Sequence, residues 1–312
     1  MRALITGITG FVGGHLADYL NTQKGVEVYG ISRHNGQGNW RGYACDMRDA
    51  KKVEKLIRQI KPDRIFHLAG QASVPLSWSD PKGTFEENLI STVNLLEAVL
   101  KARLGPRIQL AGSAHEYGIP PKPMRRIDES APMNPLSPYA VSKVSQDFLA
   151  CQYARRFNMK IVRTRAFNHV GPGQSEAYVT SSMARQIALI EAGHQKPEIL
   201  AGNLDTIRDY TDVRDVVRAY WLALEKGKAG EAYNIASGRG HSAREILELY
   251  LKLTPVKIKV RQDPGRLRQD DLARLVGNPG KFIRRTGWKP KINFKDSLKD
   301  ILNFWRKKVK NG

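Results

Sequence analysis

The segment TGITGFVG, residues 6–13, decides the fold, because it places three glycines between an apolar run and a helical pattern. Gly7, Gly10 and Gly13 give the spacing G-x-x-G-x-x-G directly after the predicted strand 2–6. Glycine lets a backbone turn sharply and approach a pyrophosphate, and the following helix N-terminus offers N–H donors and a favourable dipole. Glycines also mark plain tight turns, but the position between a strand and a helix favours a dinucleotide-binding turn.

Short apolar runs alternate with helical patterns through the first half of the chain. We expect strands at 2–6, 26–32, 64–70, 107–113 and 160–167, with helices near 11–22, 49–60, 81–103 and 138–157. Strands that alternate with helices form a parallel sheet with helices on both faces. The pattern therefore predicts an α/β protein with a doubly wound parallel sheet of the Rossmann type.

The alternation becomes irregular after residue 168, where helices are expected near 176–193, 213–226, 242–253 and 294–308. This change predicts two domains. Residues 1–167 form the dinucleotide-binding domain, and some later segments, at about 205–236, return to it. Residues 168–312 form mainly a smaller, mixed α/β C-terminal substrate domain.

Composition and cysteine usage indicate an ordinary globular protein of the cytoplasm. The chain has 312 residues, 41% hydrophobic and 26% charged, and we expect no membrane-spanning segment and no secretory leader. Its two cysteines, Cys45 and Cys151, give neither a disulfide framework nor a metal-ligand spacing. We expect two free thiols in a reducing compartment, and no bound metal.

The chain is strongly basic, because 51 Lys and Arg against 30 Asp and Glu leave a net charge of 51 − 30 = +21. Such a charge is typical of nucleic-acid-binding proteins. Here, however, the basic residues are spread over amphipathic segments such as KKVEKLIRQIK and FWRKKVK. This distribution indicates a solvated basic surface or the steering of an anionic ligand such as a nucleotide, and disfavours nucleic acid.

The end of the second strand bears on which dinucleotide is bound. An acid there would bind the ribose diol of NAD, whereas an arginine would bind the 2′-phosphate of NADP. The segment GISRHNG ends the strand with Ser32, Arg33 and His34, so NADP(H) is preferred and NAD(H) remains possible; Arg33 also fits a plain surface residue. Asp46, in ACDMRD, is a candidate partner for the adenine amine.

The predicted cofactor contacts are Gly7, Thr9, Gly10, Phe11, Val12, Arg33, Asp46, Met47, Leu68, Ala69, Gly70, Tyr139 and Lys143.

The segment LSPYAVSK, residues 136–143, begins a helix and carries a phenol and an ammonium group. Ser137 is a good N-cap, and Pro138 suits the first helical position. Tyr139 and Lys143 then lie at i and i+4 on one face. A neighbouring lysine lowers the pKa of a tyrosine from about 10, which would give a proton donor usable near neutrality. An ordinary aromatic–lysine contact on a helix surface would have the same spacing.

With Ser113 after the fourth strand, these motifs occur in the order expected of one active site. The chain resembles the extended short-chain dehydrogenase/reductase family, in its nucleotide-sugar-modifying branch, over essentially its whole length. The resemblance implies that Ser113 hydrogen-bonds the substrate oxygen and that Tyr139 exchanges the proton. It also implies that Lys143 positions the nicotinamide ribose and tunes Tyr139.

Motifs in the second half resemble the subgroup that acts on GDP-linked 6-deoxyhexoses. They are FNHVGPGQ (167–174), VTSSMARQI (179–187), GNLDTIRDYTDVRD (202–215) and TGWKP (286–290). The resemblance implies a GDP-sugar substrate, with Asn168, Arg208 and Arg268 at the GDP portion. Arginine suits this task because its planar fork matches phosphate oxygens. The predicted substrate contacts also include Val179, Arg185 and Asp271, the last of which stands where the family has Glu.

The subgroup contains C4 reductases of GDP-4-keto-6-deoxyhexoses and 4,6-dehydratases of GDP-mannose, and the segment SAHEYG (113–118) bears on the choice. The dehydratases place a glutamate two residues after the catalytic Ser or Thr, where this chain has His115. If the segment is extended, His115 shares a side with Ser113 and Glu116 points the opposite way, unless a bulge turns it inward. The basic pair of the dehydratase VTRK motif is replaced by Ser181 and Ser182.

These departures favour an NAD(P)H-dependent reductase that gives a GDP-rhamnose-type product. The alternative is a GDP-mannose 4,6-dehydratase with bound NADP, followed by another nucleotide-sugar epimerase or a non-catalytic nucleotide sensor. His115 would assist proton transfer, bind sugar hydroxyls or only pack structurally. We further expect a homodimer that binds neither nucleic acid nor a membrane.

Overall fold

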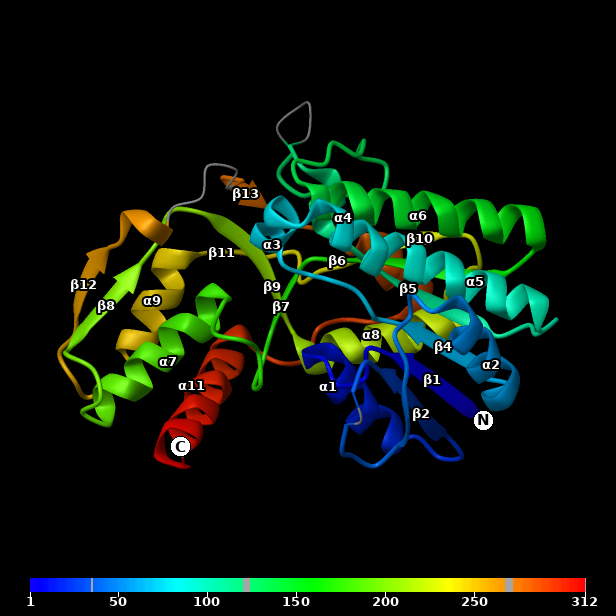
Figure 1. The fold of residues 1–312 in the computed structure, drawn as a ribbon. Coiled ribbons are helices and arrows are strands. Elements are labelled where there is room, and N and C mark those ends of the chain that lie inside the picture. Colours follow the sequence, from blue (N-terminus) through cyan, green and yellow to red (C-terminus); the bar gives the residue numbers. More distant parts are fainter. Residues whose placement is uncertain (35, 120–123, 267–271, 312) are drawn as a thin grey trace.

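The main body of the molecule is a seven-stranded parallel sheet with helices on both faces (Figure 1). The computed structural model describes residues 1–34, 36–119, 124–266 and 272–311. The order of the strands is β10-β6-β5-β4-β1-β2-β3, and they comprise β1 (Arg2–Thr6), β2 (Glu27–Ser32), β3 (Arg41–Ala44), β4 (Arg64–His67), β5 (Arg107–Ser113), β6 (Lys160–Ala166) and β10 (Ala232–Ile235). This order is that of a doubly wound Rossmann sheet, which confirms the predicted fold class.

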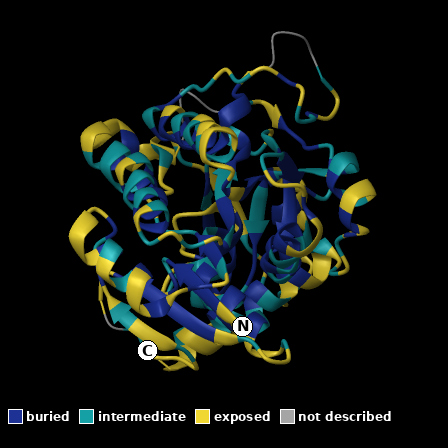
Figure 2. Ribbon diagram, turned by 90° about the vertical axis from the view of Figure 1, so that its right-hand side faces the viewer, coloured by how far each residue is buried: buried dark blue, intermediate teal, exposed yellow. Residues whose placement is uncertain are grey.

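Two hydrophobic layers fill the space between the sheet and its helices. On one face lie α1 (Phe11–Asn21), α8 (Val213–Lys226) and α10 (Gly280–Thr286), and on the other lie α2 (Ala50–Ile60), α5 (Ser91–Lys101) and α6 (Pro138–Phe157). The central strands of the sheet are deeply buried, apart from the edge strand β3, while the outer helix faces are exposed (Figure 2). Burial on both faces explains why the strands read as continuous apolar runs.

Segments from the second half of the chain return to this sheet. Strand β10 pairs in parallel with β6, and α8 packs against α1. The predicted helix at 213–226 is observed with those bounds. The division of the chain at residues 167 and 168 into two domains stays a prediction.

The predicted long helix at 81–103 is broken into several elements. The structure has α3 (Val74–Ser79), α4 (Pro81–Phe85), a single π-helical turn η1 (Glu86–Ile90) and then α5. Asn88 in the π-turn is fully buried, accepts the Gln71 backbone N–H at 2.8 Å and donates to Ser142 at 2.8 Å. The π-turn therefore directs an amide into the protein interior, as such turns often do near functional sites.

A second lobe is built mainly from residues after 168. It contains α7 (Val179–Glu191), α9 (Ala243–Leu251), α11 (Phe294–Asn311) and the parallel pair β8 (Glu198–Ala201) and β12 (Lys259–Gln262), which share one hydrophobic core. Short strands lie between the lobes (Figure 1), namely β7 (Asn168–Val170), β9 (Ile207–Asp212), β11 (Gly240–Ser242) and β13 (Arg274–Leu275). The 3₁₀ turns are η2 (Ala114–Tyr117) and η3 (Pro264–Arg266).

Substitutions at Gly13 and Gly14 test how closely α1 packs against the glycine turn. A Cβ atom at Gly13 would lie 2.7 Å from Ile8 Cα and closer still to the Gly7 carbonyl oxygen, whereas one at Gly14 would meet nothing within 4 Å. We expect Gly13→Ala to lower the melting temperature, because backbone atoms of the turn would have to move. The control Gly14→Ala should be neutral or stabilising by up to about 1 kcal/mol, on the helix-propensity scale. Equal melting temperatures for the two variants in thermal denaturation would contradict this packing.

Candidate active site

A cavity of about 210 Å³ lies at the carboxyl ends of β1, β2 and β4. Nine of the predicted cofactor contacts line it, namely Gly7, Thr9, Gly10, Arg33, Asp46, Met47, Leu68, Ala69 and Gly70. Phe11 and Val12 lie nearby in the first turn of α1, and the Phe11 ring stacks on His169 with centroids 6.2 Å apart. The remaining two predicted contacts, Tyr139 and Lys143, lie in α6.

The glycine turn gives this cavity the geometry that a pyrophosphate requires. Gly7 has φ +75°, donates its N–H to the Ile31 carbonyl at 2.8 Å and approaches Ala69 so closely that a Cβ would lie 2.9 Å from the Ala69 nitrogen. The residue at the N-cap of α1 is Gly10, which has no side chain. No N-cap side chain therefore accepts a hydrogen bond from the first N–H groups of the helix. The residues present therefore fit a dinucleotide.

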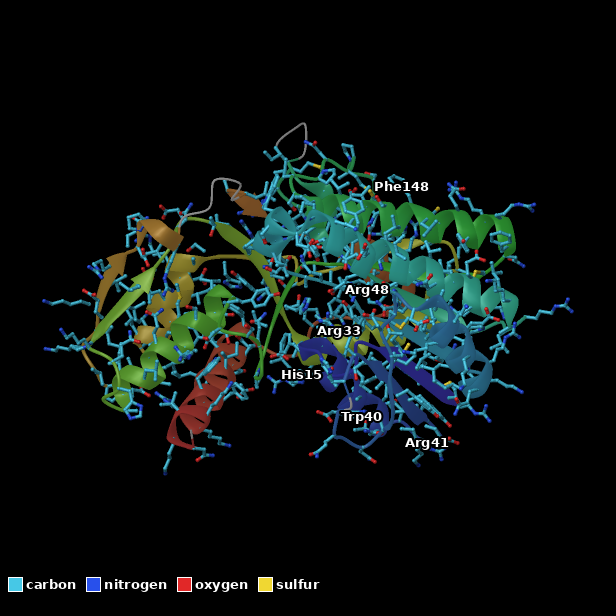
Figure 3. The ribbon with its side chains drawn as sticks, viewed as in Figure 1. His15, Arg33, Trp40, Arg41, Arg48 and Phe148 are labelled. Atoms are coloured by element: carbon cyan, nitrogen blue, oxygen red, sulfur yellow. The ribbon has the colours of Figure 1, made fainter. Side chains whose placement is uncertain are left out.

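Two arginines, Arg33 and Arg48, are among the residues that line the cavity, and both are labelled in Figure 3. Arg33 has 62% of its side chain exposed and pairs with Glu87 at 3.1 Å. Arg48 pairs with Asp46 at 2.6 Å, and this hydrogen bond lowers the pKa of the Asp46 carboxyl group. Asp46 is thus already engaged by a cation, and its contact with an adenine amine stays a prediction.

The predicted catalytic residues come together where β5 ends and α6 begins. Ser137 caps α6 by accepting the Ala140 N–H at 3.2 Å, and this fixes the first turn. Tyr139 and Lys143 are 7% and 8% exposed. Ser113 ends β5, and its side chain interacts with the Tyr139 phenol.

The prediction that Lys143 lowers the pKa of Tyr139 is wrong for the protein without a bound ligand, because the pKa of Tyr139 is raised. Burial raises the pKa of the phenol, and the hydrogen bond with Ser113 opposes this only in part. The Lys143 ammonium instead donates to the Ala111 carbonyl and to the Gln146 side chain, both at 3.0 Å. Burial lowers the Lys143 pKa to about 8, against the opposing charge of Glu116.

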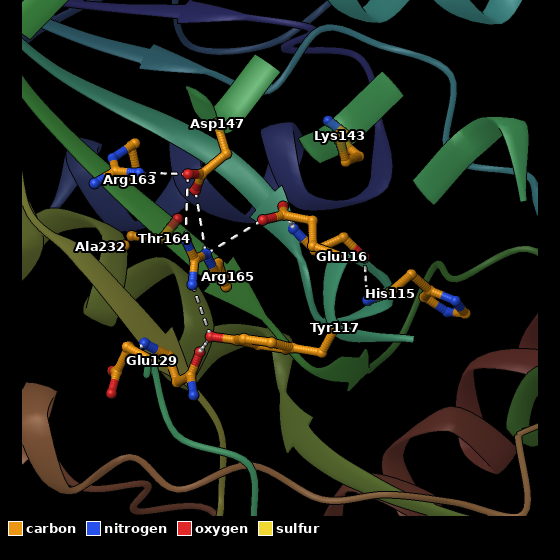
Figure 4. A network of polar contacts seen from close by, with 12 residues as sticks. His115, Glu116, Tyr117, Glu129, Lys143, Asp147, Arg163, Thr164, Arg165 and Ala232 are labelled. Carbon is orange, nitrogen blue, oxygen red and sulfur yellow. Dashed lines mark hydrogen bonds and ion pairs between the residues drawn. The ribbon is translucent and has the colours of Figure 1, made fainter. Parts of the chain in front are cut away.

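The segment after Ser113 is not extended, so the condition under which His115 would share a side with Ser113 is not met. It forms the 3₁₀ turn η2, in which Ser113 and Glu116 make a reciprocal capping box. The Glu116 carboxyl group accepts the Ser113 backbone N–H at 2.6 Å, is fully buried and lies 3.2 Å from Arg165 (Figure 4). The half-buried His115 ring instead meets Tyr139 edge to face, with centroids 5.9 Å apart. His115, rather than Glu116, therefore lies on the side of Tyr139.

The predicted substrate residues are distributed over the second lobe and the short strands. Asn168 and Arg208 lie on the paired strands β7 and β9, and Arg208 is only 9% exposed. Val179 begins α7, and Arg185 on the same helix pairs with Glu176 at 2.6 Å. Arg268 and Asp271 lie outside the described residues, so their predicted roles are not examined by the structure.

The described part of the chain carries neither a metal-ligand cluster nor a membrane-spanning helix. Within it, no three or more His, Cys, Asp or Glu side chains are grouped so as to hold a metal ion. None of its helices combines the length and apolar character needed to cross a bilayer.

Comparison with known proteins identifies the family. The GDP-mannose 4,6 dehydratase family matches residues 4–301. The chain belongs to this family. GDP-6-deoxy-D-mannose reductase of Pseudomonas aeruginosa is 35% identical over 99% of this chain and 98% of its own length. GDP-mannose 4,6 dehydratase 2 of Caenorhabditis elegans is 30% identical over 96% of this chain and 87% of its own.

Solved structures agree with this assignment to the GDP-mannose 4,6 dehydratase family. The structure of RMD from Pseudomonas aeruginosa complexed with NADPH superimposes with a TM-score of 0.88 at 34% identity, covering 99% of both chains. UDP-glucose 4-epimerase of Thermotoga maritima, solved with UDP-glucose, gives a TM-score of 0.90 at 28% identity over 99% of this chain and 100% of its own. The predicted extended short-chain dehydrogenase/reductase family is thus confirmed.

Several residues of the site were not predicted from the sequence of this family member. The cavity is also lined by Ile31, Ser32, Cys45, Arg48, Glu87 and Ser91. Arg48 follows the predicted Asp46 by two residues, so the CDMRD motif carried a signal for it. Glu87 and Ser91 come from the π-turn and the start of α5, and only the fold brings them to the cavity.

Proposed function

We propose that this chain is an NADPH-dependent reductase that delivers hydride to C4 of a GDP-4-keto-6-deoxyhexose and gives a GDP-rhamnose-type product. The observation that carries the proposal is the assembled set of Ser113, Tyr139 and Lys143, with His115 in place of a carboxylate beside the tyrosine. The likeness to the Pseudomonas aeruginosa reductase over nearly the whole chain supports the same assignment.

In this proposal the bound NADPH supplies the hydride, and the protein supplies the proton and its stabilisation. The Tyr139 hydroxyl donates its proton to the oxygen on C4, while the Ser113 hydroxyl hydrogen-bonds the same oxygen. Lys143, with a pKa of about 8, is mostly protonated at neutral pH, and in this proposal it positions the nicotinamide ribose. Burial raises the pKa of Tyr139, which keeps the proton on the phenol until the substrate oxygen takes it.

The alternative reaction, 4,6-dehydration of GDP-mannose, needs an additional group to remove the C5 proton. Glu116 faces the Ser113 backbone and Arg165 and is fully buried. In that reaction His115 would be the base, because it lies beside Tyr139. Since some relatives are named as dehydratases, the test below includes dehydration of GDP-mannose as an outcome.

The preference for NADPH rests on the arginines at the adenosine end of the cavity. Arg33 is exposed at the cavity wall and carries a charge that a 2′-phosphate would neutralise. A relative of similar length has been solved with NADPH, although other solved relatives carry NAD. NADH therefore remains a weaker substitute in the proposal.

We further propose that the protein is a homodimer and that it works in the cytoplasm. Exposed apolar side chains gather on α6 and on the elements that pack against it, and they are Leu76, Trp78, Ile90, Val141 and Phe148. Val141 and Phe148 are seven residues apart and so share one face of α6. We infer that a second copy of the chain covers this face. The two buried free thiols, Cys45 and Cys151, fit a reducing compartment.

The reaction is tested by incubating the purified protein separately with GDP-mannose and with its 4-keto-6-deoxy derivative plus NADPH. We expect turnover of the keto sugar only. Tyr139→Phe should reduce that turnover by at least about 10²-fold, because it removes the proton donor, and should leave NADPH binding intact. Tyr153→Phe, which removes another α6 phenol that donates to Glu97, serves as the control and should retain activity. Dehydration of GDP-mannose by the wild type would replace the reductase with the alternative.

Cofactor choice is tested at Arg33. Arg33→Ala should weaken NADPH roughly tenfold or more and NADH much less, since a hydrogen bond to a charged group is worth about 1.5–3 kcal/mol. Arg41→Ala removes a second exposed arginine, one that contacts Glu27 and Tyr29, and should change neither affinity. Fluorescence titration with both cofactors measures the ratio, and equal losses for Arg33→Ala would show that this residue does not bind the 2′-phosphate.

The oligomer is tested at Phe148, which is 54% exposed (Figure 3). Light scattering should give twice the chain mass of 35.0 kDa for the wild type and the single mass for Phe148→Glu, because a charge would be buried at the contact. Val260→Glu, which alters an exposed apolar residue of β12, should stay dimeric. A wild-type monomer would refute the proposed face.

A further inference from the structure

Glu116 has no part in the proposed hydride and proton transfer, yet it is a fully buried acid beside the catalytic serine. We propose that Glu116 is a positioning residue that holds Ser113 in its catalytic arrangement at the end of β5, and that its charge also supports the protonated form of Lys143. This inference rests on the proposed function, because it concerns residues to which that function gives roles.

The first contact fixes the hydroxyl group of Ser113. Glu116 Oε1 accepts the Ser113 backbone N–H at 2.6 Å, and Ser113 Oγ in turn accepts the His115 N–H at 3.2 Å. With that lone pair of Ser113 Oγ occupied, the hydroxyl proton points away from the turn and is available to Tyr139 and to a substrate oxygen. The turn thus orients the hydroxyl before substrate binds.

A second contact, between Lys143 and Ala111, joins α6 to the end of β5. Lys143 Nζ donates to the carbonyl of Ala111, two residues before Ser113. Gly112 lies between them, and a Cβ there would sit 2.5 Å from Glu116 Oε1 and 3.1 Å from the Thr164 carbonyl oxygen. The absence of a side chain at Gly112 therefore makes room for the carboxyl group of Glu116.

A network of buried charges surrounds the other oxygen of Glu116 (Figure 4). Glu116 Oε2 lies 3.2 Å from Arg165 Nε, and the same guanidinium pairs with Asp147 at 3.2 Å. Arg165 also donates to the Tyr117 hydroxyl at 3.0 Å. Asp147 is held in addition by Arg163. The charged and titratable groups that act on Glu116 thus come from α6, β6 and its own turn.

The charge of Glu116 acts on Lys143 as well as on its own turn. Burial and the neighbouring Asp147 raise the pKa of Glu116 to about 8, against the lowering effect of Arg165. Burial lowers the pKa of Lys143 to about 8, and Glu116 opposes that effect. The burial of His67 next to Lys143 keeps the imidazole neutral, with its pKa lowered to about 3. Ionised Glu116 therefore keeps Lys143 protonated on the alkaline side of neutrality.

The catalytic arm of the test compares two variants of Glu116 with the wild type. Glu116→Gln keeps an acceptor for the Ser113 N–H but cannot ionise. Lys143 then loses the negative charge that raises its pKa, so the fall of kcat at alkaline pH should begin at lower pH than in the wild type. Glu116→Leu removes the acceptor too and should lower kcat by roughly 10²-fold with NADPH affinity unchanged, the scale expected when a catalytic group is displaced.

The second arm needs no turnover. Because the pKa of Glu116 is raised in the fold, its stabilising contribution is complete below the unfolded value near 4.5 and is lost as pH rises through about 8. The melting temperature of the wild type relative to Glu116→Gln should therefore fall between pH 5.5 and 8.

Glu191→Gln provides a matched control for both arms, because Glu191 is an arginine-paired acid of the second lobe. Its hydrogen bond with Arg306 lowers its pKa, so the same substitution should give no such fall between pH 5.5 and 8 and no shift of the alkaline limb.

The outcomes separate the two proposals. An unchanged alkaline limb in Glu116→Gln, together with near-normal kcat in Glu116→Leu, overturns the positioning role. A pH-independent difference in melting temperature overturns the assignment of Glu116 as a titrating group. A wild type that reduces no keto sugar contradicts the proposed function instead, and the melting arm then still decides on Glu116.

Discussion

The site depends on the parallel pairing of the central strands, because parallel pairing brings their carboxyl ends to one edge of the sheet. β1 and β4 pair so that Thr6 lies opposite His67, and β5 and β6 pair so that Ser113 lies opposite Ala166. The residues that follow these ends form the glycine turn, the wall of the cavity and the catalytic turn. A ligand that extends along this edge meets all three, as is general for open parallel sheets.

Burial at that edge shifts the pKa values of Tyr139 and Lys143. Tyr139 and Lys143 both lie in a dry environment that favours their neutral forms, so the pKa of the phenol rises and that of the ammonium falls. Such opposed shifts in one cleft are typical of active sites. The protein's own groups therefore hold a proton on the tyrosine and place the lysine close to its titration range, where a neighbouring charge has a large effect on its state.

Local signals determined how much of this could be predicted from the sequence. The bounds of α6 agree with the predicted range 138–157, and its start was predicted from the serine–proline pair Ser137 and Pro138. Strand β3 was missed because it is a four-residue, largely exposed edge strand without an apolar run. The 3₁₀ turn after Ser113 was not predicted, although Ser113 and Glu116 have the S-x-x-E spacing of a capping box. The ion pair of Glu116 with Arg165 has no local signal, since only the pairing of β5 with β6 creates it.

The same turn bears on the choice between the two reactions. To act as the base of a dehydratase, Glu116 would have to leave the Ser113 N–H and the Arg165 guanidinium. Leaving a buried N–H without its partner costs about 1–3 kcal/mol. His115 already lies beside Tyr139 and needs no such rearrangement. A dehydratase on this scaffold would therefore use an imidazole in place of a carboxylate, whereas ketone reduction uses the residues as they stand.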